Sequence, residues 1–115
     1  MRSEPDRRTS VISVEGELDL STAPRLKWML IDALEAGASQ LVVDFSRVVF
    51  LDSTALGVLV GVTRSLDAQA RLAIVCARPN VLEIFEFAGM EGVFAIFPTL
   101  DEALAHAQGR PARDG

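Results

Sequence analysis

The sequence lacks most of the residues from which disulfides, metal sites and hydrolase active sites are built. Of its 115 residues, one is cysteine and one is histidine. Cys76 has no second cysteine to form an internal disulfide, and its apolar surroundings, RLAIVCA, predict a buried and inert thiol. His106 is far along the chain from the acids and hydroxyls discussed below, and no GxxxxGK loop is present. We therefore predict no catalytic residues, no metal and no cofactor.

Positive charge and long apolar runs are also scarce. The formal net charge is −5, and basic residues gather only near the two ends, in RSEPDRR and RPARDG. No basic face is therefore expected for binding nucleic acid. Asp52 interrupts the longest apolar run, so direct membrane insertion is not expected. With no signal-peptide pattern and a reduced cysteine, the sequence favours a cytoplasmic protein.

What the sequence does contain is an alternation of strand-like and helix-like segments. Strands are predicted at 10–16, 40–45, 70–77 and 93–97, and helices at 21–37, 54–66, 78–89 and 99–107. Short apolar strands alternating with helices indicate α/β crossover units with a covered sheet. We predict an α/β fold with a four- to five-stranded mixed sheet and about four helices packed against it.

Three polar residues interrupt the most hydrophobic stretch, VVFLDSTALGVLVGV, at residues 52–54. A helix starting at Thr54 would use Asp52 or Ser53 as its N-cap, because a side-chain oxygen there accepts an orphan backbone N–H. One polar residue is enough for that purpose. The other two therefore require a further explanation.

The helix that follows has an unusual outer side. The face predicted to pack on the sheet carries Leu56, Leu59, Val60, Thr63 and Leu66. The opposite face carries Thr54, Gly57, Val58, Gly61 and Ser65. Two interior glycines cost about 1 kcal/mol each relative to alanine, so a closely approaching partner would explain them. The alternatives are that a second layer of the same chain covers this face, or that the glycines ease packing near the sheet.

The hydroxyl of Ser53 would lie at the positive end of this helix, where backbone N–H groups stabilise an anion such as a phosphate. Asp52 adjoins it, and the predicted topology brings Asp19, at the end of the first strand, near it. A phosphoryl group would add negative charge beside these acids and weaken binding of an acidic or closely fitting partner. Asp19 is explained equally well as a residue that caps the turn into the first helix and as one with a direct role near Ser53.

Three segments resemble the STAS family, specifically the small stand-alone anti-sigma factor antagonists of bacteria. They are GELDLSTAPRL from Gly16, LVVDFSRVVFLDSTALGVLVG from Leu41, and the segment from Leu72 to Leu104. The Asp-Ser-Ser/Thr-x-Leu-Gly element at residues 52–57 is the most specific part. The resemblance implies the STAS fold over residues 10–108, with a flexible N-terminal segment at 1–9 and a C-terminal tail at 109–115.

The resemblance also implies a function. The unmodified protein would bind an anti-sigma factor that is also a serine kinase of the histidine-kinase-like ATPase type, and so release a sigma factor. The kinase would phosphorylate Ser53, with Thr54 as a possible second acceptor, and a serine phosphatase would reverse this. Asp19 and Asp52 map to the acidic surroundings of the acceptor. The alternative is a constitutive STAS subunit of a transporter or signalling assembly, with Ser53 only a cap.

The sequence departs from the family at its beginning. Members usually carry an extra edge strand before the 10–16 strand, whereas here only the charged segment MRSEPDRRT, with Pro5, precedes it. Proline and charge disfavour strands. We therefore expect this strand to be short or missing, which would leave an exposed sheet edge.

Overall fold

The computed structural model describes residues 1–6, 9–65, 71–87 and 94–107. Its strands are β1 (Arg2–Asp6), β2 (Thr9–Leu18), β3 (Gln40–Leu51), β4 (Arg71–Val75) and β5 (Ala95–Phe97). Its helices are α1 (Ala23–Glu35), α2 (Ser53–Ser65), α3 (Pro79–Phe87) and α4 (Leu100–Ala107). Strands and helices alternate from β2 onward, as the sequence predicts.

The strands form one five-stranded sheet in the order β1-β2-β3-β4-β5. β2, β3, β4 and β5 are parallel neighbours, and β1 pairs antiparallel with β2. Each parallel step is made through a helix, as parallel pairing requires. The predicted mixed α/β sheet with four helices is confirmed.

The edge strand expected to be short or missing is present. Arg2–Asp6 pairs with residues 9–13 of β2, with Pro5 opposite Ser10. Proline has no backbone N–H to donate. An edge strand is hydrogen-bonded on one side only, so it tolerates a proline better than a central strand does. Residues 2–6 thus belong to the sheet rather than to the flexible N-terminal segment that the sequence predicts.

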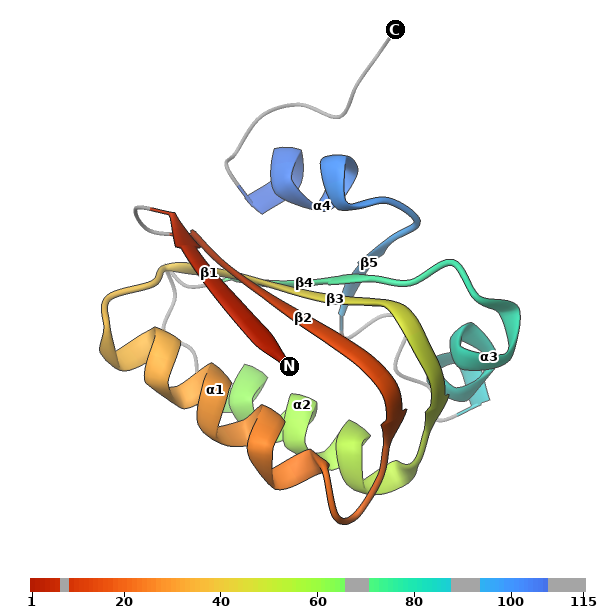
Figure 1. The fold of residues 1–115 in the computed structure, drawn as a ribbon. Helices are drawn as coiled ribbons and strands as arrows, with labels where there is room; N and C mark the ends of the chain where they lie inside the picture. The colour runs from red at the N-terminus through yellow and green to blue at the C-terminus, as the bar shows by residue number, and fades with distance from the viewer. Residues whose placement is uncertain (7–8, 66–70, 88–93, 108–115) are drawn as a thin grey trace, which may run out of the picture.

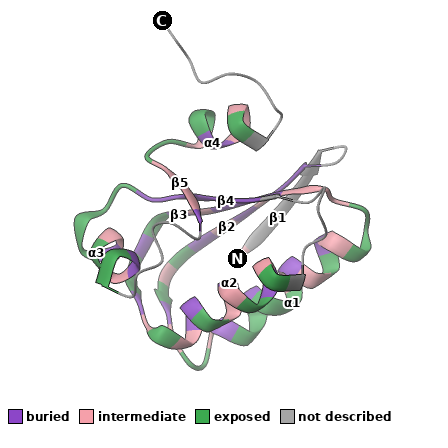
Figure 2. Ribbon diagram, turned by 180° about the vertical axis from the view of Figure 1, so that it is seen from behind, coloured by how far each residue is buried: buried purple, intermediate pink, exposed green. Residues whose placement is uncertain are grey.

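The helices divide between the two faces of the sheet (Figure 1). α1 and α2 lie side by side on one face, and residues of α1, α2 and α3 share the main core with β2 and β3. α4 covers the other face, where Ala103 packs with Val42, Ala73 and Val75. The strands are mostly buried, whereas α1 and α2 alternate between buried and exposed turns (Figure 2).

Two strands are longer than the sequence predicts, and their extra length positions the site. β3 pairs with β4 only over 40–44, but with β2 as far as Leu51. β2 continues beyond the predicted end at Gly16 to Leu18, with register shifts between 13 and 15 and between 16 and 17. These irregularities bend the paired strands, as bulges do. The ends of β2 and β3 thus project together toward the start of α2.

The helix ends follow the expected residues where they are described. Gly37, with φ of +103°, directly follows the turn that ends α1, a conformation that glycine adopts without strain. At α4 the Glu102 N–H donates to Thr99 Oγ1 at 3.2 Å, as its capping spacing predicts. Gly89, predicted to end α3, lies outside the described residues. Within the described part of the chain, no helix has the length and apolar character needed to cross a membrane.

Phe85 ties α3 to the main core. It is fully buried, stacks on Phe45 with centroids 6.5 Å apart, and meets Phe94 edge-on at 5.9 Å. We expect Phe85→Ala to lower the free energy of unfolding by about 3–5 kcal/mol, the usual cost of deleting a buried phenylalanine. Urea unfolding followed by circular dichroism measures the loss.

The matched control is Phe87→Ala, two residues along the same helix, where the side chain is 99% exposed. It should change the unfolding free energy by less than about 0.5 kcal/mol. Equal losses for the two variants would contradict the orientation of α3.

Candidate functional site

Asp52, not Ser53, caps α2. Its carboxylate Oδ1 accepts the N–H of Thr54 at 2.9 Å and that of Ala55 at 3.3 Å. Its own N–H donates to the carbonyl of Leu18 at 3.1 Å, which joins the end of β3 to the end of β2. One aspartate thus fixes the start of the helix and its position against the sheet.

Ser53 therefore does not cap α2. It is the first residue of α2, its side chain is exposed, and its hydroxyl has no hydrogen-bond partner in the described part of the chain. Thr54 is half-buried beside it, so its hydroxyl is the less accessible of the two. The expectation that a hydroxyl stands open at the positive end of a helix is met at Ser53.

Asp19 organises the turn between β2 and α1. Its Oδ1 accepts the hydroxyl of Ser21 at 2.8 Å and backbone N–H groups of Ser21 and Thr22 at 3.0 and 3.2 Å. The hydrogen bond from the Ser21 hydroxyl is the main cause that holds the pKa of Asp19 below its usual value. This carboxylate is therefore charged at neutral pH, and its turn-capping role is established.

The two acids lie on neighbouring strand ends. Leu18 pairs with Leu51, and each is followed by one of the aspartates. Ser53 therefore stands next to Asp52 and beside the turn that Asp19 holds. The sequence predicts that these three residues lie close together. The parallel pairing of β2 with β3 brings the two strand ends that precede Asp19 and Asp52 side by side.

The outer face of α2 is open. Residues 53, 57, 61 and 64 are exposed and follow one line along the helix. A Cβ added to Gly57 or Gly61 would meet no atom within 4 Å. No second layer formed by the described residues covers the glycines, and they do not ease packing against the sheet.

The buried face of α2 is rotated from the predicted one. The buried residues are Ala55, Leu56, Leu59 and Val62. Val58, predicted on the outer face, is half-buried against the core, and Val60 and Thr63 are half-buried rather than central. The reason is that α1 packs beside α2, so α2 buries residues against a helix as well as the sheet. Of the other predicted residues, Leu66 and the Ser65 side chain lie outside the description.

A groove of about 700 Å³ opens between the start of α2 and α3. We call it the α2–α3 groove; its lining residues are Ser53, Leu56, Asn80, Glu83, Ile84, Glu86 and Phe87. The Asn80 side-chain amide donates to the carbonyl of Val49 at 3.1 Å and ties the first turn of α3 to β3. Sequence reasoning missed this groove, although Phe87 falls off the stripe of Val81, Ile84 and Phe85 and hints at a second apolar side of α3.

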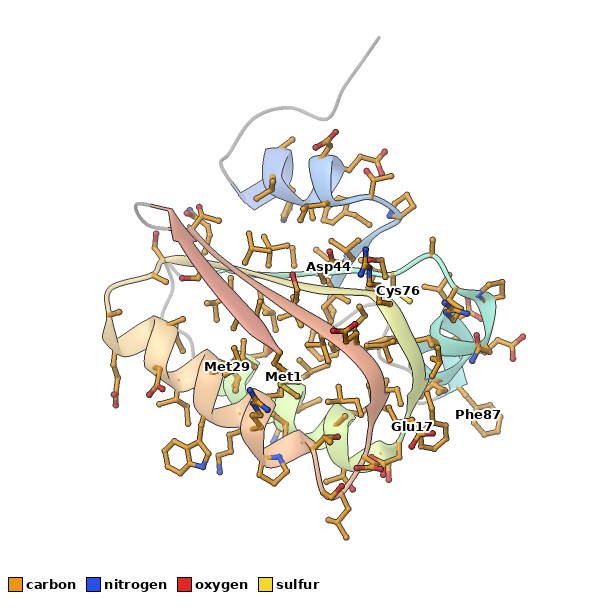
Figure 3. All side chains as sticks on the ribbon, in the orientation of Figure 1. Met1, Glu17, Met29, Asp44, Cys76 and Phe87 are labelled. Atoms are coloured by element: carbon orange, nitrogen blue, oxygen red, sulfur yellow. The ribbon has the colours of Figure 1, made fainter. Side chains whose placement is uncertain are left out.

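Large apolar side chains are exposed at the same end of the molecule. Leu20 is 73% exposed in the turn beside Asp19, and Val49 and Phe50 are nearly half exposed just before Asp52. Phe87 projects from the end of α3 (Figure 3). Scattered exposed apolar residues are normal, but residues gathered around one feature indicate an interaction surface.

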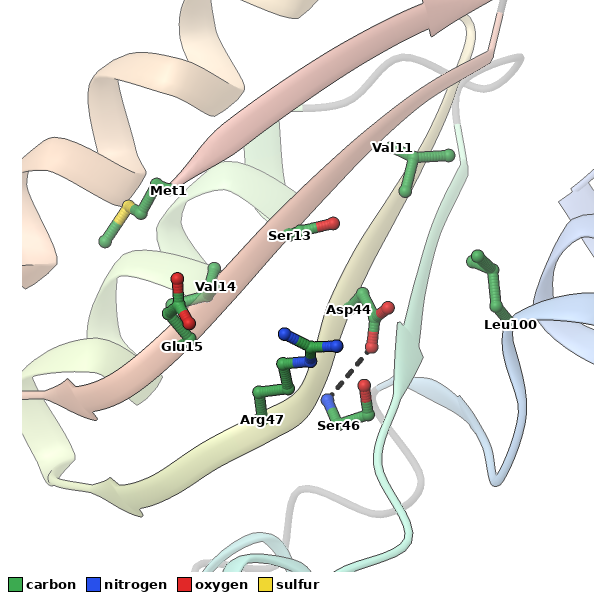
Figure 4. A pocket seen from close by; sticks show the side chains of 9 residues that line it. All are labelled: Met1, Val11, Ser13, Val14, Glu15, Asp44, Ser46, Arg47 and Leu100. Atoms are coloured by element: carbon green, nitrogen blue, oxygen red, sulfur yellow. Dashed lines mark hydrogen bonds between the residues drawn. The ribbon is translucent and has the colours of Figure 1, made fainter.

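A second hollow, of about 420 Å³, lies between β2, β3 and the start of α4 (Figure 4). It is lined by Met1, Val11, Ser13, Val14, Glu15, Asp44, Ser46, Arg47 and Leu100. Its charged groups have both signs, and Asp44 accepts the backbone N–H of Ser46 at 2.9 Å. Neither Ser53 nor the exposed face of α2 contributes to it.

Other groups singled out by the sequence are unremarkable. Cys76 is buried as predicted, and burial raises the pKa of its thiol. In the ranges that the structure covers, no three His, Cys, Asp or Glu side chains gather as metal ligands would.

The fold and this end of α2 define a small α/β interaction domain that presents one serine. Residues 2–103 match the STAS domain family, and the chain belongs to that family. Within it, the relatives are bacterial anti-sigma factor antagonists. The chain is 28% identical over 100 residues to the anti-sigma-F factor antagonist RsfB of Mycobacterium tuberculosis, covering 87% of this chain and 82% of that protein.

Solved structures of anti-sigma factor antagonists also superpose on this chain. An anti-sigma factor antagonist from Mycobacterium paratuberculosis superposes with a TM-score of 0.87 at 31% identity, covering 93% of this chain and 92% of that one. The anti-sigma factor antagonist SpoIIAA in its unphosphorylated form superposes with a TM-score of 0.81 at 29% identity, covering 96% and 97%. The Bacillus SpoIIAA has also been solved in a phosphorylated form, at a TM-score of 0.71 and 27% identity, covering 91% and 96%.

The Asp52 cap generates a stability prediction. Asp52→Ala should lower the free energy of unfolding by about 0.5–2 kcal/mol, because two N–H groups at the helix start lose their acceptor. Asp52→Asn should lose less, since asparagine caps helices well. Urea unfolding at pH 7 measures both. As a control, Asp32→Ala removes an exposed carboxylate that makes no side-chain hydrogen bond in the described chain, and it should not destabilise.

Proposed function

We propose that this protein, unphosphorylated, binds an anti-sigma factor that is also a serine kinase, and thereby releases a sigma factor. Phosphorylation of Ser53 by that kinase ends the interaction, and a serine phosphatase restores it. Thr54 is proposed as a second acceptor. In this proposal the protein works in the cytoplasm, has no catalytic activity of its own and binds no nucleic acid.

The observation that carries the proposal is the exposed side chain of Ser53 at the start of a helix face that no described residue covers. Because Asp52 already accepts the N–H groups of Thr54 and Ala55, the serine is not needed to hold the helix. Its exposure makes it reachable by a kinase. The bare surface at Gly57 and Gly61 allows a partner backbone to approach closely.

The local charges explain how phosphorylation can act as a switch. In the transfer, the Ser53 oxygen forms a bond to the γ-phosphorus of ATP, the bond to ADP breaks, and the hydroxyl proton passes to a base. The product adds about −1.5 to −2 charges next to Asp52 and the Asp19 turn. The helix start offsets part of this repulsion. The phosphoryl group takes up space that a closely fitting partner needs around the hydroxyl. Its charge also disturbs the balance of charges across the contact.

The comparisons support the general role. Relatives named anti-sigma factor antagonists match nearly the whole chain, and SpoIIAA is known in unphosphorylated and phosphorylated forms. A sulfate transporter family protein superposes at 19% identity, which concerns the fold alone. It does not favour the alternative of a constitutive transporter subunit.

Ser53 variants test the switch against the candidate anti-sigma factor kinase of the same genome. Ser53→Ala should bind it within about threefold of the unmodified protein and should not be phosphorylated. Ser53→Asp should bind at least about tenfold more weakly, because it adds permanent negative charge at the contact. Calorimetry measures affinity, and mass spectrometry locates phosphate after incubation with ATP. Equal affinity of the wild type and both variants for the kinase would contradict the proposal.

The glycine face gives an independent test. Gly57→Gln should leave the protein at least as stable, because its Cβ enters open space and glutamine favours helix more than glycine by up to about 1 kcal/mol. It should nevertheless weaken binding to the kinase by about tenfold or more, since the new side chain fills the contact. Asp101→Gln on α4, across the sheet, is the control and should bind normally. Normal binding by Gly57→Gln would show that the partner docks elsewhere.

A further inference from the structure

We propose that the α2–α3 groove is a second contact region for the anti-sigma factor and receives a segment with an apolar side chain flanked by lysine or arginine. This inference rests on the proposed function and adds the chemistry of the partner. It makes α3, rather than only the start of α2, a determinant of partner choice.

The groove offers an apolar seat. Leu56 and Ile84 line it, and so does Phe87, which is 99% exposed. An aromatic ring in this position contributes nothing to the core, whereas in an interface it can be buried completely. Aromatic residues in the centre of an interface commonly carry much of its binding energy. The apolar side chain of the partner would therefore lie between Phe87 and Ile84.

The seat is already formed in the free protein. Val81 and Phe85 are fully buried, so the opposite side of α3 is anchored in the main core. Asn80 holds the first turn of the helix through its hydrogen bond to Val49. Because the walls need not rearrange, docking costs little conformational entropy.

The charge of the groove specifies the flanking residues of the partner. Glu83 and Glu86 are exposed, lie three residues apart on α3, and form no ion pair in the part of the chain that is described. Among the described residues, no lysine or arginine lines the groove, and Asp52 directly precedes the lining residue Ser53. Lysine or arginine on either side of the apolar residue would complement these acids and speed association at low salt.

The groove is continuous with the proposed phosphorylation site, because Ser53 and Phe87 both line it, one from the start of α2 and the other from α3. The two helices have different tasks. At Ser53 the partner presents the polyanionic nucleotide, which a phosphoserine repels. On α3 the basic segment binds glutamates that phosphorylation does not alter. Contacts on α3 therefore determine which kinase binds, whereas the phosphorylation state of Ser53 determines when it binds.

The test uses Phe87→Ala, and the double variant Glu83→Gln with Glu86→Gln, against the anti-sigma factor kinase. Phe87→Ala should weaken binding about tenfold or more. The double variant should also weaken it and reduce the dependence of affinity on salt concentration. Both should raise KM for phosphorylation of Ser53 and leave kcat unchanged, because the reacting groups are intact. Circular dichroism and urea unfolding check that each variant is folded, and Asp101→Asn on α4 controls for loss of a surface charge.

The outcomes separate this inference from the proposal on which it rests. If Ser53→Asp loses binding while the α3 variants bind and react like the wild type, the groove inference is wrong and the switch stands. If the wild type neither binds the kinase nor is phosphorylated by it, both fail. If sedimentation shows a dimer that Phe87→Ala converts to a monomer, the groove holds a second copy of this chain, and the inference is overturned.

Discussion

The structure around the site depends on the hydrogen bonds of one aspartate. Asp52 accepts the first free N–H groups of α2 with its carboxylate and donates its own N–H to Leu18 on the neighbouring strand. These bonds align the helix start with the ends of β2 and β3. They also satisfy donors that Ser53 would otherwise serve, so its hydroxyl remains available. Because Asp52 already caps the helix, phosphorylation of Ser53 would not remove a capping hydrogen bond.

The surroundings of Ser53 come from segments far apart in the sequence. The long pairing of β2 with β3 carries the Asp19 turn to it, and α3 contributes the acids and the phenylalanine of the groove. α1 packs beside α2, which leaves the glycine face as its open side. This end of the molecule thus combines acidic and exposed apolar side chains around the exposed side chain of Ser53.

Much of this was predictable from local pattern. Alternation of apolar strands and capped helices predicted the α/β sheet, and the run of Asp52, Ser53 and Thr54 predicted a capped helix with a surplus hydroxyl. β1 was not predictable, because Pro5 and the charges around it disfavour a strand unless a neighbouring edge is available to pair with. The buried face of α2 was rotated for a related reason: periodicity assumes one packing partner, and α2 has two. That is why Val58 is half-buried and Val62 fully buried.

The sequence by itself determined the order of elements from β2 onward, the approximate helix starts and the serine at the start of α2, because capping and periodicity act within a few residues along the chain. Only the tertiary structure decided which of Asp52 and Ser53 caps the helix, that no described residue covers Gly57 and Gly61, and that Phe87 and two glutamates of α3 line the same groove as Ser53. The cap is a local contact that Asp52 and Ser53 could each have made, whereas the groove depends on contacts between residues about thirty positions apart, such as Asn80 with Val49, which no local pattern encodes.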